Sequence, residues 1–173
     1  LAMPGQTAFE FGCFPGRYLF EIGSRGYEVS GCDRTPRVAA ELPAWLAGNQ
    51  LKVGEFFRCD YRQVPRNRFD VVASFGFVEH FRDYIDVFRF HFEFVKPGGL
   101  VLIQFPNFSG VVQRVLRELL DKDNLENHVI AAMNLDEYRR EAAQFGEILS
   151  CSHYGGFDFW TDHYKHPLWP ARG

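Results

Sequence analysis

Short apolar runs alternate along the chain with stretches whose apolar residues recur every three or four positions. The run at residues 71–75 is nearly continuous, which is typical of a parallel strand buried on both faces. Strands are predicted at residues 8–11, 27–32, 71–75 and 100–105, with a short one ending at Asp60. Helices are predicted at residues 17–25, 38–47, 84–95 and 111–120, the second of them kinked or split by Pro43. This alternation predicts an α/β fold with a mostly parallel sheet.

The segment at residues 88–94 fits two patterns. Every second residue is phenylalanine, as in a half-exposed strand, whereas Ile85 and Phe92 also share a helical face. Two parallel strands need a crossover between them, which is usually a helix. We therefore expect a helix from about residue 84 to 95, with Asp83 as its cap.

The last third of the chain carries weaker signals. A loop is expected at residues 124–133, followed by a capping box with Asn134 at its head that begins a helix ending near Gly146. Residues 148–154 alternate like a strand. Residues 157–173 are aromatic and punctuated by proline, and they are too few to predict a closing hairpin.

Length and composition indicate one domain over residues 1–173. Hydrophobic residues make up 46%, which excludes a disordered class, and the net charge of −3 comes without clusters of Lys or Arg. This pattern predicts no nucleic-acid and no membrane partner. Without a spanning segment or a signal-peptide pattern, a cytoplasmic location is the default expectation. The four cysteines lack metal-like spacing, so we expect reduced, packed thiols and no metal site.

The first predicted strand leads into a glycine turn, a helix and a second strand. Gly12 and Gly16 flank the turn, and Asp33 ends the second strand. In nucleotide-binding units of this kind, an acid about 20 residues after the glycines accepts hydrogen bonds from ribose hydroxyls. The dinucleotide fingerprint fails, because Phe14 and Arg17 stand where it needs glycine.

Four stretches, in order, resemble the motifs of class I S-adenosylmethionine-dependent methyltransferases. They are the glycine turn at residues 10–16, the strand end at 58–61, the fourth strand at 69–81 and the turn into the fifth strand at 95–103. The resemblance implies a Rossmann-like three-layer αβα sandwich of the seven-stranded methyltransferase type, and the short ends leave open an incomplete sheet at both ends. It also implies S-adenosylmethionine as cofactor and a small-molecule methyl acceptor, most plausibly methylated at oxygen.

The same resemblance assigns the cofactor site. Glu10 would meet the amino end of the methionine part, Asp33 the ribose and Asp60 the adenine amino group, while Tyr61 and Phe75 would enclose the adenine or simply pack in the core. The full set of expected cofactor-binding residues is Glu10, Gly12, Cys13, Phe14, Gly16, Asp33, Arg34, Asp60, Tyr61 and Phe75. Phe14 departs from the family, which usually has glycine there. Either the turn is rearranged or cofactor affinity is reduced.

His80 is the expected catalytic residue. It follows the fourth strand, at the edge where open α/β sheets bind ligands, and a histidine suits proton transfer near neutral pH. A structural histidine that caps the following loop is the competing interpretation. Secondary candidates on the late loops are His128, His153, Tyr154, Asp158 and His163.

Two other functions stay open. A non-catalytic partner or sensor domain of the same fold is favoured by Phe14 and by the absence of a preceding cap, and it is opposed by the intact acids Asp33 and Asp60. A nicotinamide oxidoreductase is disfavoured by the failed fingerprint. The aromatic residues at 157–160 and 166–170 suggest an exposed patch for a homodimer partner, a missing segment, or a cover over the end of the sheet.

Overall fold

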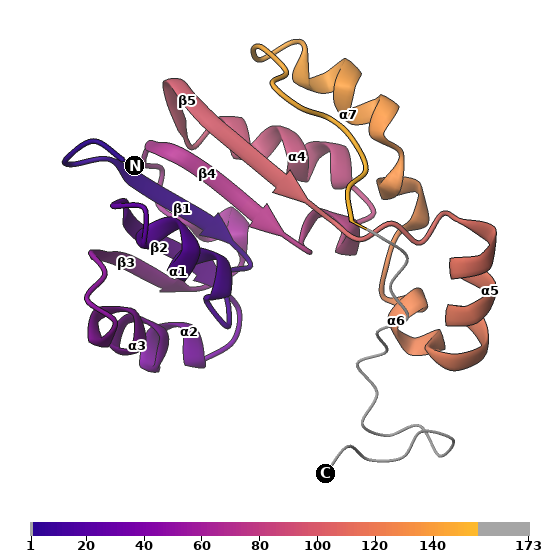
Figure 1. Ribbon diagram of the computed structural model, residues 1–173, viewed down its shortest axis with the longest axis horizontal. Helices are drawn as coiled ribbons and strands as arrows, with labels where there is room; N and C mark the ends of the chain where they lie inside the picture. Colours follow the sequence, from indigo (N-terminus) through magenta and orange to yellow (C-terminus); the bar gives the residue numbers. More distant parts are fainter. Residues whose placement is uncertain (1, 156–173) are drawn as a thin grey trace.

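The computed structural model describes residues 2–155, which build a five-stranded parallel sheet in the order β3-β2-β1-β4-β5 (Figure 1). The strands are β1 Thr7–Phe11, β2 Glu28–Asp33, β3 Val53–Arg58, β4 Phe69–Phe75 and β5 Val95–Gln104. β1 pairs with β2 on one side and β4 on the other, so the strand order reverses at β1. Ligands of open α/β sheets bind beyond the carboxyl ends of the strands at such a point.

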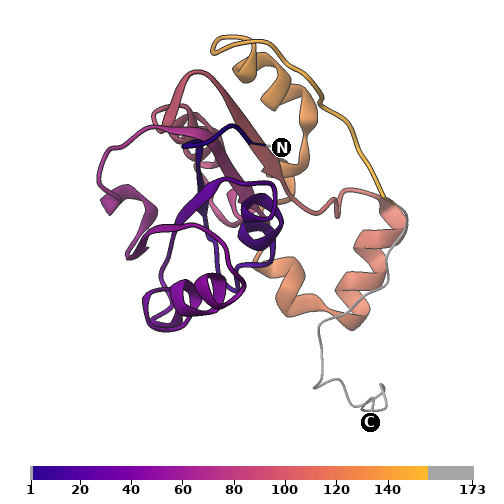
Figure 2. The same cartoon turned by 60° about the vertical axis from the view of Figure 1, so that its left-hand side comes forward.

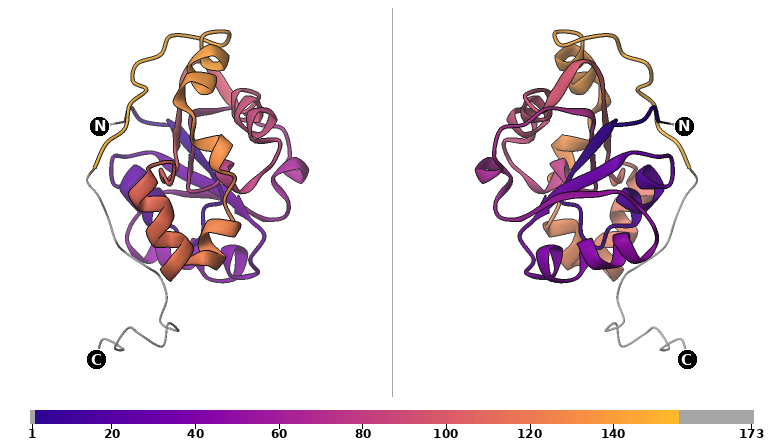
Figure 3. Two further views of the ribbon diagram at one scale, coloured as in Figure 1. Left: turned by 90° about the vertical axis from the view of Figure 1, so that its right-hand side faces the viewer. Right: turned by 90° about the vertical axis from the view of Figure 1, so that its left-hand side faces the viewer.

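Helices connect the strands and cover both faces of the sheet. The α-helices are α1 Arg17–Gly23, α2 Arg37–Ala40, α3 Leu42–Gly48, α4 Tyr84–Phe92, α5 Val111–Leu120, α6 Lys122–Glu126 and α7 Leu135–Ala142. Short 3-10 helices are η1 Tyr61–Gln63, η2 Val78–His80 and η3 Ile130–Met133. The orange α7 and the purple α3 lie on opposite sides of the molecule (Figure 2, Figure 3). Among the described residues, no helix combines the length and the apolar character needed to cross a membrane.

Each face of the sheet has its own hydrophobic core. On β1, Phe9 and Phe11 enter a core that includes Phe88 of α4 and Tyr138 of α7. Ala8 enters the other core, which is built with residues of α1, α2 and α3. The alternation of side chains along a strand explains this division. The predicted three-layer αβα arrangement with a parallel sheet is confirmed.

Several predicted boundaries shift. Pro43 lies in the first turn of α3, where proline is tolerated, and the predicted helix splits into α2 and α3. The helix expected to reach residue 95 ends at Phe92, because the Phe94 carbonyl accepts a hydrogen bond from the Phe69 amide and the chain turns into β5. Asp83 occupies the N-cap position of α4 without a side-chain cap bond.

Three sequence-based predictions are wrong. The strand expected to end at Asp60 ends at Arg58, because the Asp60 side chain caps η1. The loop expected at residues 124–133 contains part of α6 and all of η3. No strand forms at residues 148–154. There, Arg139 donates a hydrogen bond of 2.6 Å to the Cys151 carbonyl and fastens the segment to α7. Residues 157–173 lie outside the described residues.

His91 of α4 is buried and neutral. Its Nδ1 donates to the Val87 carbonyl at 2.8 Å, so its Nε2 accepts from the Ser74 hydroxyl of β4 at 2.9 Å. Burial lowers the pKa of His91 to about 4. In the unfolded chain, His91 takes up a proton near the ordinary histidine pKa of about 6.5, whereas in the folded protein it stays neutral down to about pH 4. The free energy of unfolding therefore falls as the pH drops from about 6.5 to about 4.

We therefore expect the free energy of unfolding to fall by about 3 kcal/mol between pH 6.5 and pH 4 relative to a His91→Gln variant. Urea unfolding at half-unit pH steps measures the difference. His153→Gln, at an exposed position, is the matched control and should keep the wild-type slope. Equal pH slopes for wild type and His91→Gln would contradict the buried neutral imidazole.

Candidate functional site

The turn after β1 is built around two glycines in left-handed conformations. Gly12 has φ 68° and Gly16 has φ 94°, values that side chains with a Cβ rarely adopt. The amides of Gly12 and Cys13 donate to the Cys32 carbonyl on β2, at 2.9 and 3.1 Å. A Cβ at Gly12 would lie 2.6 Å from the Phe77 ring, so the close approach of Phe77 also requires glycine there.

Asp33 joins the end of β2 to this turn. Its Oδ2 accepts from the Phe14 amide at 3.2 Å, and its Oδ1 accepts from the Thr35 amide at 2.9 Å. Among the described residues other than glycine, only Gln50 has a positive φ, so Phe14 carries no such strain. The Phe14 ring lies under the Arg37 guanidinium, 4.8 Å from ring centroid to Cζ. Of the two possibilities for Phe14, this geometry favours a turn that accommodates the ring.

Glu10 is a buried acid beside the turn with one oxygen unpaired. Its Oε2 has no hydrogen-bond partner among the described residues, and only 2% of the residue is exposed. Burial raises the pKa of Glu10 well above its usual value, and the charge of Asp33 raises it further. A backbone hydrogen bond at Leu19 and the charge of Arg17 act in the opposite direction. An unpaired buried carboxylate suits a cationic ligand group.

Among the remaining sequence-predicted cofactor residues, Asp60, Tyr61 and Phe75 contact other side chains or backbone groups. The Asp60 side chain accepts from the Arg62 amide at 3.1 Å as the cap of η1. Tyr61 is buried among aromatic rings, with Phe77 5.7 Å away between centroids. Phe75 stacks on Tyr18 at 3.8 Å. Cys13 is buried, and burial raises the pKa of its thiol well above the usual value. Arg34 is exposed.

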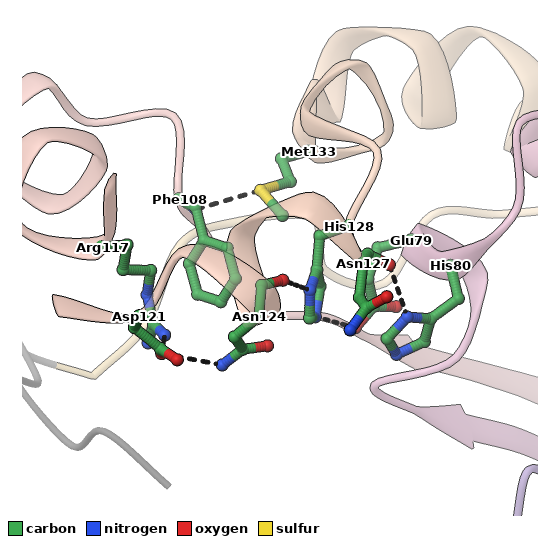
Figure 4. Close-up of polar contacts among 9 residues, drawn as sticks. All are labelled: Glu79, His80, Phe108, Arg117, Asp121, Asn124, Asn127, His128 and Met133. Atoms are coloured by element: carbon green, nitrogen blue, oxygen red, sulfur yellow. Dashed lines mark hydrogen bonds and ion pairs between the residues drawn. The ribbon is translucent and has the colours of Figure 1, made fainter. Parts of the chain in front are cut away.

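A second group of side chains gathers at the carboxyl edge of the sheet after β4 (Figure 4). Glu79 and His80 lie on η2, and His128 follows α6. The two imidazole rings are 4.5 Å apart between centroids, and Glu79 Oε1 lies 4.0 Å from His128 Nε2. Burial raises the pKa of Glu79 to about 7 and lowers the pKa of His128. Figure 1 shows α5 and α6 beyond the arrowheads of the strands, at the same edge as the glycine turn.

A cleft of about 710 Å³ opens between the segment after β5 and α7. Its lining includes Ser109, Met133, Asn134, Asp136, Glu137 and His153. The candidate His153 therefore faces a cavity, and Tyr154 beside it is exposed. Asp158 and His163 lie outside the described residues.

Three features of the site were not predicted from the sequence. Phe77 packs against Gly12, and Tyr18 packs against Phe75. Phe77 lies in the stretch at 69–81 that resembles the family's fourth strand, and Tyr18 lies outside the matched stretches, but no local pattern indicates which residue either ring contacts. Glu79 and His80 adjoin in sequence, but His128 is 48 positions further along, and only the fold brings it to them.

The comparisons with known proteins identify the family of the chain. Residues 4–147 match a family described as a methyltransferase domain. The chain belongs to this methyltransferase domain family. S-adenosylmethionine is the methyl donor of this class of methyltransferase. The unpaired Oε2 of Glu10 and the carboxylate of Asp33 at the glycine turn fit this donor, whose methionine part carries an ammonium group and whose ribose carries hydroxyls.

Relatives of this methyltransferase domain include two plant enzymes. Phosphoethanolamine N-methyltransferase of Triticum aestivum is 32% identical over 103 residues, or 58% of this chain and 20% of that protein. Phosphoethanolamine N-methyltransferase 3 of Arabidopsis thaliana is 30% identical over 102 residues, or 58% of this chain and 21% of that protein. The chain thus spans about a fifth of the length of these curated relatives.

One solved structure resembles most of the chain. A Bacillus halodurans protein, described provisionally as a methyltransferase, superposes with a TM-score of 0.64 at 19% identity. The match covers 84% of this chain and 64% of that one. This likeness shows that the methyltransferase domain has the fold expected of its class.

Proposed function

We propose that this domain binds S-adenosylmethionine at the turn after β1 and serves the transfer of its methyl group to a small-molecule acceptor. The observation that carries the proposal is the buried, unpaired Oε2 of Glu10 beside a glycine turn that Asp33 braces. An unpaired buried carboxylate is unfavourable on its own, and a cationic ligand group would compensate it.

In this proposal, each of three acids binds a different group of the donor. Glu10 would hold the ammonium group, Asp33 the ribose hydroxyls and Asp60 the adenine amino group. Tyr61 and Phe75 would border the adenine, and Cys13, Phe14 and Arg34 would line the turn. Asp33 has lone pairs to spare, because each of its oxygens accepts one hydrogen bond from the described part of the chain and a carboxylate offers about four acceptor sites.

When bound, S-adenosylmethionine supplies a methyl carbon made electrophilic by its sulfonium, so that the acceptor's lone pair forms a bond to carbon while the carbon–sulfur electron pair stays on sulfur. The chain mainly has to position the acceptor in line. An amine or hydroxyl also loses a proton, and we propose His80 as its recipient. The Nδ1 of His80 donates to the Asn127 carbonyl at 2.9 Å, which leaves the lone pair of Nε2 free.

The proposal also concerns which atom of the acceptor receives the methyl group. The sequence alone favours oxygen, whereas the names of the plant relatives specify an amine nitrogen. The cleft beside α7 includes the charged residues Asp136, Glu137 and Arg139 in its lining, but neither His80 nor a residue of the glycine turn lines it, so the choice of acceptor rests on the names of the relatives. Phosphoethanolamine is therefore the first acceptor to test, followed by hydroxyl-bearing small molecules.

One observation favours a second candidate, a non-catalytic partner or sensor domain. Phe77 covers Gly12, and Tyr61 and Phe75 already have aromatic partners. Such packing stabilises the turn in the folded protein whether or not the domain catalyses a reaction. The two candidates differ in whether donor binding leads to methyl transfer.

The test is an assay for S-adenosylhomocysteine formed with each acceptor in turn. We expect acceptor-dependent product, reduced about 100-fold or more in His80→Ala and unchanged in Glu118→Gln, an exposed control on α5. Donor binding without product from any acceptor would favour the partner domain. A chain that neither binds the donor nor forms product would contradict both candidates.

A further inference from the structure

Glu79, His80 and His128 form a cluster of three potential metal ligands, here called the EHH cluster. One ligand atom from each residue lies within 4.8 Å of the other two. The close-up shows the Glu79 carboxylate near the imidazoles, and the Phe108 ring lies on the other side of His128, 4.9 Å from its ring between centroids (Figure 4). Sequence spacing gives no hint of this cluster, because His128 comes from a distant segment.

Hydrogen bonds to the backbone fix both histidines in the same tautomer. The Nδ1 of His80 is 2.9 Å from the Asn127 carbonyl oxygen, and the Nδ1 of His128 is 2.6 Å from the Asn124 carbonyl oxygen. A carbonyl oxygen only accepts, so each Nδ1 carries hydrogen and each Nε2 presents a lone pair when the ring is neutral. Histidines that bind metals usually have this arrangement, with the second ring nitrogen donating to a carbonyl or carboxylate.

Glu79 provides an independent observation. The residue is fully buried, and neither carboxylate oxygen has a hydrogen-bond partner among the described residues. Its Oε1 faces the Nε2 of His128 at 4.0 Å, which is too long for a hydrogen bond. A buried acceptor thus faces another acceptor, an arrangement that a cation between them would stabilise.

We propose that the EHH cluster binds one divalent transition-metal ion, with Zn²⁺ as the first candidate, through Glu79, the Nε2 of His80 and the Nε2 of His128. One carboxylate and two imidazoles make up the protein ligands of several catalytic zinc sites, which leave a further position open. Mg²⁺ and Ca²⁺ prefer oxygen ligands alone, so the two nitrogens select against them.

The ligand atoms of the EHH cluster lie within 4.8 Å of one another, and between Glu79 and His128 the geometry needs only a small adjustment. Tetrahedral Zn²⁺ with bonds of about 2.1 Å holds its ligand atoms about 3.4 Å apart. The observed 4.0 Å between Glu79 and His128 would close by about 0.6 Å. His80 is exposed, so the open coordination position would face solvent or an acceptor.

This inference goes beyond the proposed methyl transfer and alters the role of one residue in it. A lone pair of His80 that binds a metal is not available for a proton, so the acceptor would be oriented at the open coordination position and its proton would pass to solvent water beside the exposed His80. Phe77 lies two residues before Glu79 and packs against Gly12, which places the EHH cluster close to the glycine turn. Metal binding needs neither donor nor acceptor, so its failure is distinguishable from failure of methyl transfer.

The test uses the full chain, stripped of metal with a chelator and titrated with Zn²⁺ by calorimetry and with Co²⁺ by visible absorption. We expect one ion per chain and Co²⁺ bands typical of nitrogen and oxygen ligands. Glu79→Gln and His128→Asn should each weaken binding more than about 100-fold. His153→Asn, outside the cluster, should bind like the wild type.

Thermal unfolding checks that each variant is folded. If Glu79→Gln does not fold, His80→Asn at the exposed position decides the matter and is expected to weaken binding by the same order. Binding that is absent from the wild type, or equal in the wild type and all cluster variants, would overturn the proposal. In that event, a protonated Glu79 would account for the buried carboxyl without any ion.

Discussion

Replacing Glu10 with glutamine is expected to weaken S-adenosylmethionine binding about 10- to 100-fold while making the free protein more stable at pH 8. The charged hydrogen bond to the donor's ammonium group would be lost, at a cost of about 1.5–3 kcal/mol. At the same time, the buried carboxylate with its unpaired Oε2 would be replaced by a neutral group of similar shape. Calorimetry measures the first effect and urea unfolding the second.

The pH dependence of this effect has a definite sign. Because the pKa of Glu10 is raised by folding, the folded protein holds its proton where the unfolded chain has lost it. Stability is therefore fully present below the usual carboxyl pKa of about 4.3 and falls as the pH rises, by up to about 1.4 kcal/mol per pH unit. His91 acts in the opposite direction over part of this range, so wild type and Glu10→Gln are compared at each pH.

Glu118→Gln, an exposed change of the same kind on α5, is the control for both measurements. It should alter neither the affinity nor the pH dependence. Donor affinity that is unchanged in Glu10→Gln would remove the observation on which the proposed function rests. If the free energy of unfolding of wild type and of Glu10→Gln changed equally with pH, folding would not raise the pKa of Glu10.

Replacing Asp33 with alanine is expected to lower the affinity for S-adenosylmethionine by about 100-fold or more. The carboxylate braces the turn through the amides of Phe14 and Thr35, and in the proposed function it also binds the ribose hydroxyls. Loss of about 3 kcal/mol of charged hydrogen bonding corresponds to roughly that factor. Asp33→Asn keeps an oxygen for the turn and should lose less affinity.

The matched control is Asp86→Ala on α4, whose side chain is 72% exposed. We expect this variant to bind like the wild type. An Asp33→Ala protein that is folded and binds the donor normally would show that the ribose is held elsewhere, and the assignment of the turn would then be wrong.

Much of the fold could be predicted from the sequence because local pattern and long-range pairing agree. The apolar run of β4 and the glycine turn after β1 each permit few conformations, so both were predicted correctly in type. Residues 148–154 show where this reasoning fails. Alternation predicts a strand only if a partner edge is within reach, and the hydrogen bond from Arg139 to Cys151 holds this segment against α7 instead.

The candidate site likewise has one part that the sequence predicts and another part that only the fold brings together. Glu10, Gly12, Gly16 and Asp33 lie within one βαβ unit, so sequence spacing predicts that they meet, and the structure brings them together. The EHH cluster depends on how the chain after α6 returns to β4, which no spacing encodes. The packing of Tyr61 and Phe75 against other rings likewise follows from the phenylalanine-rich core rather than from a motif.

The most direct test of donor binding at the turn after β1 is a nitrogen-15 NMR titration of the wild-type chain with S-adenosylhomocysteine. We expect saturable shifts of the amide signals of Gly12, Cys13, Gly16 and Asp33, with little change at the far end of the sheet around Lys96. No shifts at millimolar ligand, or saturable shifts that spare the turn, would contradict donor binding at this turn.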